Sequence, residues 1–251
     1  MCLVYNIIMK RYLATVQYIG KNYSGFQKQD NGITIQQVIE DALENIFGAK
    51  TEVFASGRTD AGVNAYAQTI HFDSNTTIPA HKIPLAANIV LPDDVKLLSC
   101  KEVKSDFNAR FDVKKKTYEY NCFVSNVKLP TKEYSYWLTS MPDIKKMKEC
   151  AKIICGTHDF RAFMSAGSQA KTFERTVFDI KIMQKNKDIV FDVTGNGFLY
   201  NMVRIIVGTL LEVGYGKKTI EDVEYALKSK KREYAGYLVP PHALFLKKVV
   251  Y

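Results

Sequence analysis

A carboxylate in a glycine-flanked turn is the first feature of this sequence that could carry out chemistry. Asp60 lies two positions after Arg58, and Gly57 and Gly62 flank the pair. Glycine permits tight turns and the close approach of a ligand to the backbone, and loops held by rigid strands often carry catalytic groups. The same residues are also typical of an ordinary turn, in which the aspartate bonds to its own backbone. The segment alone leaves both interpretations open.

A single cation in an apolar helical run is the second feature. Arg204 lies among Val203, Ile205 and Ile206, shortly after a glycine-rich turn at residues 195–197. Burial of a guanidinium is expensive unless a partner compensates its charge. We therefore expect a carboxylate to meet Arg204. The glycine-rich turn at the start of a helix could also bind a phosphate, although this signal is weak by itself.

A run of lysines before an aromatic strand is the third feature. Lys114, Lys115 and Lys116 precede the segment 117–123, which contains Tyr118. Lysines at this place would suit phosphate contacts beside a ring that can stack on a base. The alternative is a solvated strand edge whose lysines prevent aggregation.

The overall charge points in the same direction. The chain of 251 residues contains 35 lysines and arginines against 26 aspartates and glutamates, which gives a net charge of +9. An excess of this size favours a polyanionic partner, most often nucleic acid. A lysine-rich surface without such a partner is the plain alternative.

Cysteine and histidine spacing argues against a metal centre. Five cysteines are scattered without a C-x-x-C pair, and the four histidines lack metal-ligand spacing, so each histidine is expected to be structural or to lie at the surface. Reduced thiols in a cytosolic protein are the simplest interpretation. The sequence contains no nucleotide-binding fingerprint, and we expect no metal site. The first eight residues lack the features of a signal peptide, and Met9 could be the true start.

Apolar periodicity predicts strands that alternate with helices. The clearest element is a helix over residues 35–47, which Thr34 with Gln37 begins and Gly48 ends. The other predicted elements are strands at 12–18, 53–55, 68–72, 95–103, 117–123 and 244–250, a hairpin at 173–183 and 189–193, and helices at 144–154, 199–213 and 219–227. This order suggests two similar α/β units, which we place at residues 1–106 and 107–251.

Five ordered segments resemble the TruA family of tRNA pseudouridine synthases. They are residues 57–63, 107–111, 116–120, 156–160 and 195–210, and they follow the family's order and spacing across nearly the whole chain. One such segment would be a weak match, but five in order are specific. The resemblance implies an α/β (α+β) fold of two related ferredoxin-like halves. Their strands would form one extended, mostly antiparallel sheet with helices on one face and an active cleft between the halves.

The resemblance also assigns roles to single residues. It implies isomerisation of uridine to pseudouridine at tRNA positions 38, 39 and 40 without a cofactor, with Asp60 as the essential carboxylate. Tyr118 would pack on the target base, Arg58 would help to hold that base flipped out, and Arg204 would pair with Asp60. The further tRNA contacts that it implies are Phe107, Asn108, Ala109, Arg110, Phe111, Ser168, Gln169, Ala170, Lys171 and Thr172.

Several positions depart from the family pattern. A histidine is usual where Asn64 and Asn108 stand, an aspartate is common at Ile19, a tryptophan is common at Phe26, and the tail at residues 237–244 differs. The departures leave open a pseudouridine synthase with a different or narrower set of RNA targets. A non-catalytic RNA-binding module is a further alternative, which rests on the charge alone. The family is homodimeric, and we expect a cytoplasmic enzyme whose carboxylate forms a covalent adduct or abstracts a sugar proton.

Overall fold

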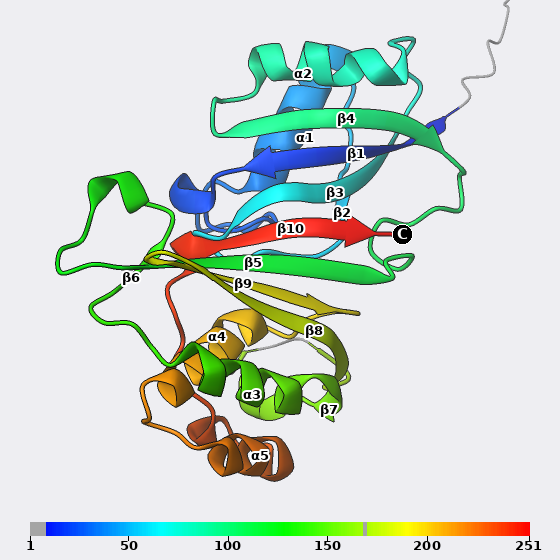
Figure 1. The fold of residues 1–251 in the computed structure, drawn as a ribbon. Helices are drawn as coiled ribbons and strands as arrows, with labels where there is room; N and C mark the ends of the chain where they lie inside the picture. The colour runs from blue at the N-terminus through cyan, green and yellow to red at the C-terminus, as the bar shows by residue number, and fades with distance from the viewer. Residues whose placement is uncertain (1–8, 168–169) are drawn as a thin grey trace, which may run out of the picture. The chain divides into compact units, whose positions relative to one another are not determined.

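The structure is a computed structural model that describes residues 9–167 and 170–251 (Figure 1). The first eight residues, which the sequence analysis treats as an extension, lie outside the described residues, and so do Ser168 and Gln169. The chain forms two units. One consists of the described residues up to Val113 together with Tyr251, and the other runs from Lys114 to Val250.

The first unit is built on a small antiparallel sheet. Strand β1 (Lys10–Tyr18) pairs with β3 (Asn64–Ser74) on one side and with β4 (Val95–Val103) on the other, and β2 (Phe54–Ala55) extends the sheet beyond β3. Alternate residues of β1 are buried, as expected for a strand with one face on a core. This alternation places the core of the unit on one side of the sheet.

Two helices supply the other side of that core. Helix α1 (Ile35–Phe47) begins at Thr34, whose hydroxyl accepts a hydrogen bond from a backbone N–H of the first turn, and ends at Gly48 in the left-handed conformation. The ring of Phe47 lies 6.0 Å from that of Phe72 on β3. Helix α2 (Ile83–Val90) is joined to β4 by the side chain of Asn88, which both donates to and accepts from the backbone of Leu97 at 2.8 Å.

The second unit has a larger sheet with helices on one side. Each neighbouring pair in the order β10-β5-β9-β8-β7 is antiparallel, while β6 pairs in parallel with β5. Figure 1 shows the three helices of the unit gathered on one side of β8 and β9. The elements are β5 (Lys115–Val124), β6 (Tyr136–Leu138), α3 (Ile144–Ile154), β7 (Gly156–Asp159), β8 (Glu174–Lys185), β9 (Asp188–Gly195), α4 (Met202–Gly214), α5 (Ile220–Ser229) and β10 (Leu244–Val250).

Single-turn 3₁₀ helices connect these elements. They lie at Gly20–Asn22, Ala80–Lys82, Pro130–Lys132, Arg161–Phe163, Arg232–Tyr234 and Pro241–Ala243. Among the described residues, no helix is both long and apolar enough to cross a bilayer.

The predicted fold class, α/β with mostly antiparallel strands, is confirmed. The helix at 35–47 and the strand at 95–103 have the predicted bounds. The helix predicted from residue 199 begins instead at Met202, because Asn201 adopts a left-handed backbone (φ 63°) that no helix interior accepts. Helix α2 and strands β6 and β7 were not predicted.

Helix α4 is buried on almost every side and packs against the chain's own backbone. A side chain at Gly208 would overlap the carbonyl oxygen of Tyr237, whereas a Cβ at Gly197 would make ordinary contact, 3.7 Å from Arg175. We expect Gly208→Ala to lower the free energy of unfolding by about 2–3 kcal/mol through overpacking. The matched Gly197→Ala should stay within about 0.5 kcal/mol of wild type. Urea unfolding curves would measure both, and equal stability of the two variants would contradict this packing.

Candidate active site

The turn that carries Asp60 is fastened to the first unit by one buried amide. Gln68 on β3 is fully buried, and its Oε1 accepts a hydrogen bond from the Ser56 hydroxyl at 2.6 Å. Its Nε2 donates to the carbonyl oxygen of Gly57 at 2.9 Å. Because both ends of the amide are used, the turn is held in one position just before Asp60.

A second set of contacts holds the middle of the turn. The hydroxyls of Tyr18 and Thr59 are hydrogen bonded at 2.7 Å, and the backbone N–H of Phe26 donates to the Thr59 carbonyl at 3.1 Å. Burial raises the pKa of Tyr18 well above its usual value, so this phenol stays neutral. Gly25 has φ 92°, and a Cβ there would lie 2.9 Å from the Thr59 oxygen, so glycine is required at this position.

The turn closes just after the carboxylate. The backbone N–H of Val63 donates to the carbonyl oxygen of Asp60 at 3.1 Å, and Gly62 has φ 76°. The Asp60 side chain is half-buried, and Arg58 is exposed. Asp60 thus lies at the edge of a rigid turn, where a carboxylate can meet a ligand.

Tyr118 has a fixed place in the second unit. It lies on β5, opposite Val193 on β9 and Leu246 on β10, and its side chain is 8% exposed. The ring of Phe198, from the turn that follows β9, meets it edge to face with centroids 5.3 Å apart. This geometry is the favourable one for two aromatic rings.

Arg204 is buried as predicted, with 9% of its surface exposed. Its Nε donates to the Val239 carbonyl at 2.7 Å, and its Nη1 donates to Asn201 Oδ1 at 2.6 Å. Asn201 in turn donates to the Ser165 hydroxyl at 2.9 Å. Both of these partners of Arg204 are neutral oxygens of its own unit, and neither was predicted. Asn201 could have been suspected from the sequence, since asparagine tolerates a left-handed backbone and stands three residues before the arginine.

Residues 107–112 form a turn shaped by its own side chains. Asn108 Oδ1 accepts hydrogen bonds from the backbone N–H of Arg110 at 2.9 Å and of Phe111 at 3.3 Å. The Asp112 carboxylate accepts from the N–H of Asn108 at 2.8 Å. Ala109 is fully buried, while Phe111 is 78% exposed with the Arg110 guanidinium 5.8 Å from its ring centre. The turn therefore presents a cation and an aromatic ring to solvent.

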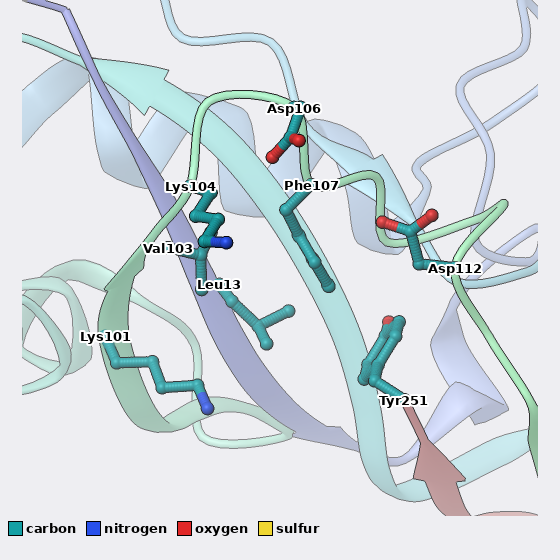
Figure 2. A pocket seen from close by; sticks show the side chains of 8 residues that line it. All are labelled: Leu13, Lys101, Val103, Lys104, Asp106, Phe107, Asp112 and Tyr251. Atoms are coloured by element: carbon teal, nitrogen blue, oxygen red, sulfur yellow. The ribbon is translucent and has the colours of Figure 1, made fainter.

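A pocket of about 490 Å³ lies beside this turn (Figure 2). Phe107 and Tyr251 line it, with ring centroids 5.0 Å apart, and Lys101, Lys104 and Asp106 lie around them. Among the described residues with a predicted site role, Phe107 is the one that lines this pocket. The pocket is therefore separate from the turn of Asp60.

The second group of predicted RNA contacts is only partly described. Ala170 is half-buried, and Lys171 and Thr172 are exposed. The Thr172 hydroxyl accepts a hydrogen bond from the Arg175 guanidinium at 3.3 Å. These residues remain predictions as RNA contacts.

The described residues hold no cluster of metal ligands, and burial affects the thiols of two of their cysteines. Within the described ranges, no group of three or more histidine, cysteine, aspartate or glutamate side chains could hold a metal ion. Burial raises the pKa of the Cys100 and Cys150 thiols to about 12, so both stay protonated at neutral pH and are poor nucleophiles.

A family model described as tRNA pseudouridine synthase matches residues 14–112 and 150–251. The chain belongs to the tRNA pseudouridine synthase family. Members of this family are isomerases. The two matched stretches include strands and helices of both units, while β5, β6 and the start of α3 lie in the unmatched stretch between them.

Relatives match this family member over nearly its whole length. Proteins named tRNA pseudouridine synthase A from Thermoanaerobacter sp. (strain X514) and Clostridium acetobutylicum are 43% and 45% identical to it, and each match covers 97% of this chain and 100% of the relative. The one from Anoxybacillus flavithermus is 43% identical, over 97% of this chain and 99% of its own. Among solved structures, a chain of a Cbf5-Nop10-Gar1 complex has a TM-score of 0.38 at 13% identity, covering 94% of this chain and 48% of its own. The family assignment therefore rests on the sequence matches.

Asn64 and Asn108, where the resemblance implies a histidine, have structural roles. Asn64 is 1% exposed, and its Oδ1 accepts a hydrogen bond from the backbone N–H of Gly20 at 2.8 Å. Asn108 caps the turn of Arg110 and Phe111 with its side-chain oxygen. Both asparagines thus supply a hydrogen-bond acceptor to the backbone.

The position of the buried guanidinium yields a prediction. Asn201→Gly keeps the left-handed backbone and removes the acceptor from Arg204, so we expect a loss of about 2 kcal/mol in the free energy of unfolding. Asn201→Ala removes the acceptor and also strains the backbone, which should cost about 1 kcal/mol more. Urea denaturation of both variants would measure the two effects. A glycine variant as stable as wild type would contradict the role of this amide.

Proposed function

We propose that this chain isomerises uridine to pseudouridine at positions 38, 39 and 40 of the tRNA anticodon stem-loop, with Asp60 as the catalytic carboxylate. The observation that carries the proposal is the full-length similarity to proteins named tRNA pseudouridine synthase A, at 43–45% identity for the three described above. The rigid setting of the Asp60 turn supports it further, because catalytic groups must be held in place before substrate binds.

The reaction needs a carboxylate and a positioned base. The C1′–N1 bond of uridine breaks, the uracil rotates, and C1′ rejoins the base through C5, while the C5 proton is lost and N1 gains one. Asp60 forms a covalent adduct or removes a sugar proton. In this proposal Tyr118 packs on the uracil, Arg58 holds the flipped nucleotide, and Arg204 stabilises the Asp60 carboxylate. The two neutral acceptors of Arg204 fix its position without neutralising its charge.

RNA contacts would come from exposed cations and rings. Flipping a base out of a helix costs a few kcal/mol, so the rest of the RNA must be held firmly. Arg110, Phe111, Lys171 and Thr172 are exposed, and we propose them as contacts together with Phe107, Asn108, Ala109 and Ala170. The family resemblance further supports a homodimer in the cytoplasm, which light scattering of the purified protein and fractionation of cells would test.

A narrower set of target uridines is the second candidate function. It is motivated by Asn64 and Asn108, which stand where the family usually has histidine. Both side chains accept hydrogen bonds from backbone N–H groups of the first unit, and Asn108 lies in a proposed RNA-contact turn. Mapping pseudouridine in RNA from a deletion strain separates the candidates. Loss at positions 38, 39 and 40 supports the wider assignment, and loss at one of them supports the narrower one.

Asp60→Asn is the direct test of the catalytic role. We expect tritium release from C5-labelled uridine in tRNA to fall by roughly 10⁴-fold or more, since removal of an essential group leaves little residual rate. Affinity for tRNA should be retained, because the substitution is nearly isosteric. Asp93→Asn is a matched control on a fully exposed carboxylate and should react like wild type. If the wild-type protein released no tritium from any tRNA pool, the proposed enzymatic activity would be contradicted. The non-catalytic RNA-binding module would then be the remaining alternative.

Salt dependence tests the electrostatic part of the proposal. The net charge of +9 would act mainly on phosphates, and each neutralised phosphate releases counterions. We expect tRNA affinity to fall at least about tenfold between roughly 50 and 200 mM salt. Filter binding over a salt series measures this slope, and a flat response would count against phosphate-dominated binding.

A further inference from the structure

A buried histidine holds the turn that carries Arg110 and Phe111. His71 on β3 is 3% exposed, and its Nδ1 lies 3.1 Å from the backbone N–H of Ala109, which donates to it. A ring nitrogen that accepts a hydrogen bond carries no proton, so His71 is neutral and its own proton is on Nε2. The imidazole ring stacks on Phe54, with centroids 5.0 Å apart and planes within 18°. This stacking fixes the plane of the imidazole ring and so the direction in which Nδ1 points.

The same turn is fastened at two further points. The hydroxyl of Tyr251 donates to the Ala109 carbonyl at 2.9 Å and is hydrogen bonded to the Thr69 hydroxyl at 2.6 Å. The Arg11 guanidinium donates to the Phe107 carbonyl at 2.9 Å. The backbone before Arg110 is therefore tied to the sheet through both the N–H and the C=O of Ala109.

The fastened backbone supports a surface suited to RNA. The exposed ring of Phe111 and the guanidinium of Arg110 lie together at the tip of the turn. Aromatic rings stack on unpaired bases and arginine binds phosphate, and this combination is typical of RNA recognition. A contact surface that is ordered before binding avoids the entropic cost of being ordered on binding.

We propose that His71 is the positioning residue of this RNA-contact turn, and that protonation of its imidazole releases Ala109 and weakens RNA binding. The inference rests on the proposed function in one respect, which is that the partner of the turn is RNA. His71 itself lies beneath the turn and would act through Ala109 without touching RNA.

The surroundings of His71 favour the neutral form. Burial lowers the pKa of His71 from its usual 6.5, and the charge of Arg11 on β1 lowers it further. Asp73 on β3 and Asp112 in the turn oppose this shift, but they are outweighed. Because the pKa is lower in the folded state, the stabilisation by neutral His71 is complete above pH 6.5. It is lost as the pH falls through the lowered pKa.

Two substitutions distinguish the effect of the hydrogen-bond acceptor at position 71 from the effect of its protonation. Asn at position 71 can place an amide oxygen near the Nδ1 site and does not titrate, whereas Phe keeps a ring for stacking and offers no acceptor. We expect His71→Asn to bind tRNA nearly as wild type at pH 7.5 and to lose less affinity than wild type as the pH falls through the lowered pKa of His71. His71→Phe should bind about fivefold more weakly than wild type at pH 7.5, and this difference should shrink as wild-type His71 becomes protonated. In steady state its KM for tRNA should rise by the same factor while kcat is unchanged.

Controls keep the outcome decisive. His81→Asn, at an exposed histidine of the same unit, should leave the pH profile of binding as in wild type. Tyr251→Phe removes the other tie to Ala109 and should weaken binding while keeping the pH dependence, so it tests the turn even if a His71 variant fails to fold. Active wild type with unchanged KM and pH profile in all His71 and Tyr251 variants would overturn this inference alone. Absence of pseudouridine formation by wild type would instead overturn the proposed function.

Discussion

The candidate site of the first unit depends on a hydrogen-bonded amide that water does not reach. Gln68 accepts from the Ser56 hydroxyl and from the backbone N–H of Thr69, and it donates to the Gly57 carbonyl. Each such bond, if left unmade in a buried place, costs about 1–3 kcal/mol. The strand and the turn must therefore form together. The position of Asp60 is then a property of the packed unit, set before any substrate arrives.

Much of the fold follows from local signals in the sequence. The helix of residues 35–47 has one apolar face, a threonine cap and a terminal glycine, and all three features act within a few residues of each other. Helix α2 was not predicted because it is apolar on nearly all sides. Leu85 and Ile89 are 69% and 84% exposed, so periodicity cannot tell its inner face from its outer one. Leu97, whose backbone N–H donates to Asn88 of this helix, lies on a strand later in the chain.

The sequence predicted which residue types belong to the candidate site, but it did not predict the hydrogen-bond partners of those residues. The burial of Arg204 could be read from its apolar neighbours, and it is confirmed. Its acceptor Val239 lies 35 residues away in sequence, and a backbone carbonyl leaves no signature in the residue type. His71 was expected to be structural or to lie at the surface. Its role toward Ala109 depends on a contact across 38 residues, which only the folded chain brings together.

The tail at residues 237–244 is tied closely to helix α4 and to strand β5. Two of its contacts are made by main-chain atoms: the Val239 carbonyl accepts a hydrogen bond from Arg204, and the Pro240 carbonyl accepts one from the Tyr120 hydroxyl at 3.0 Å. Gly208 lets the tail backbone lie directly on the helix. The path of the tail backbone therefore fixes two hydrogen-bond acceptors, and one of them binds a buried guanidinium. A substitution at position 239 or 240 removes neither acceptor as long as the backbone keeps this path.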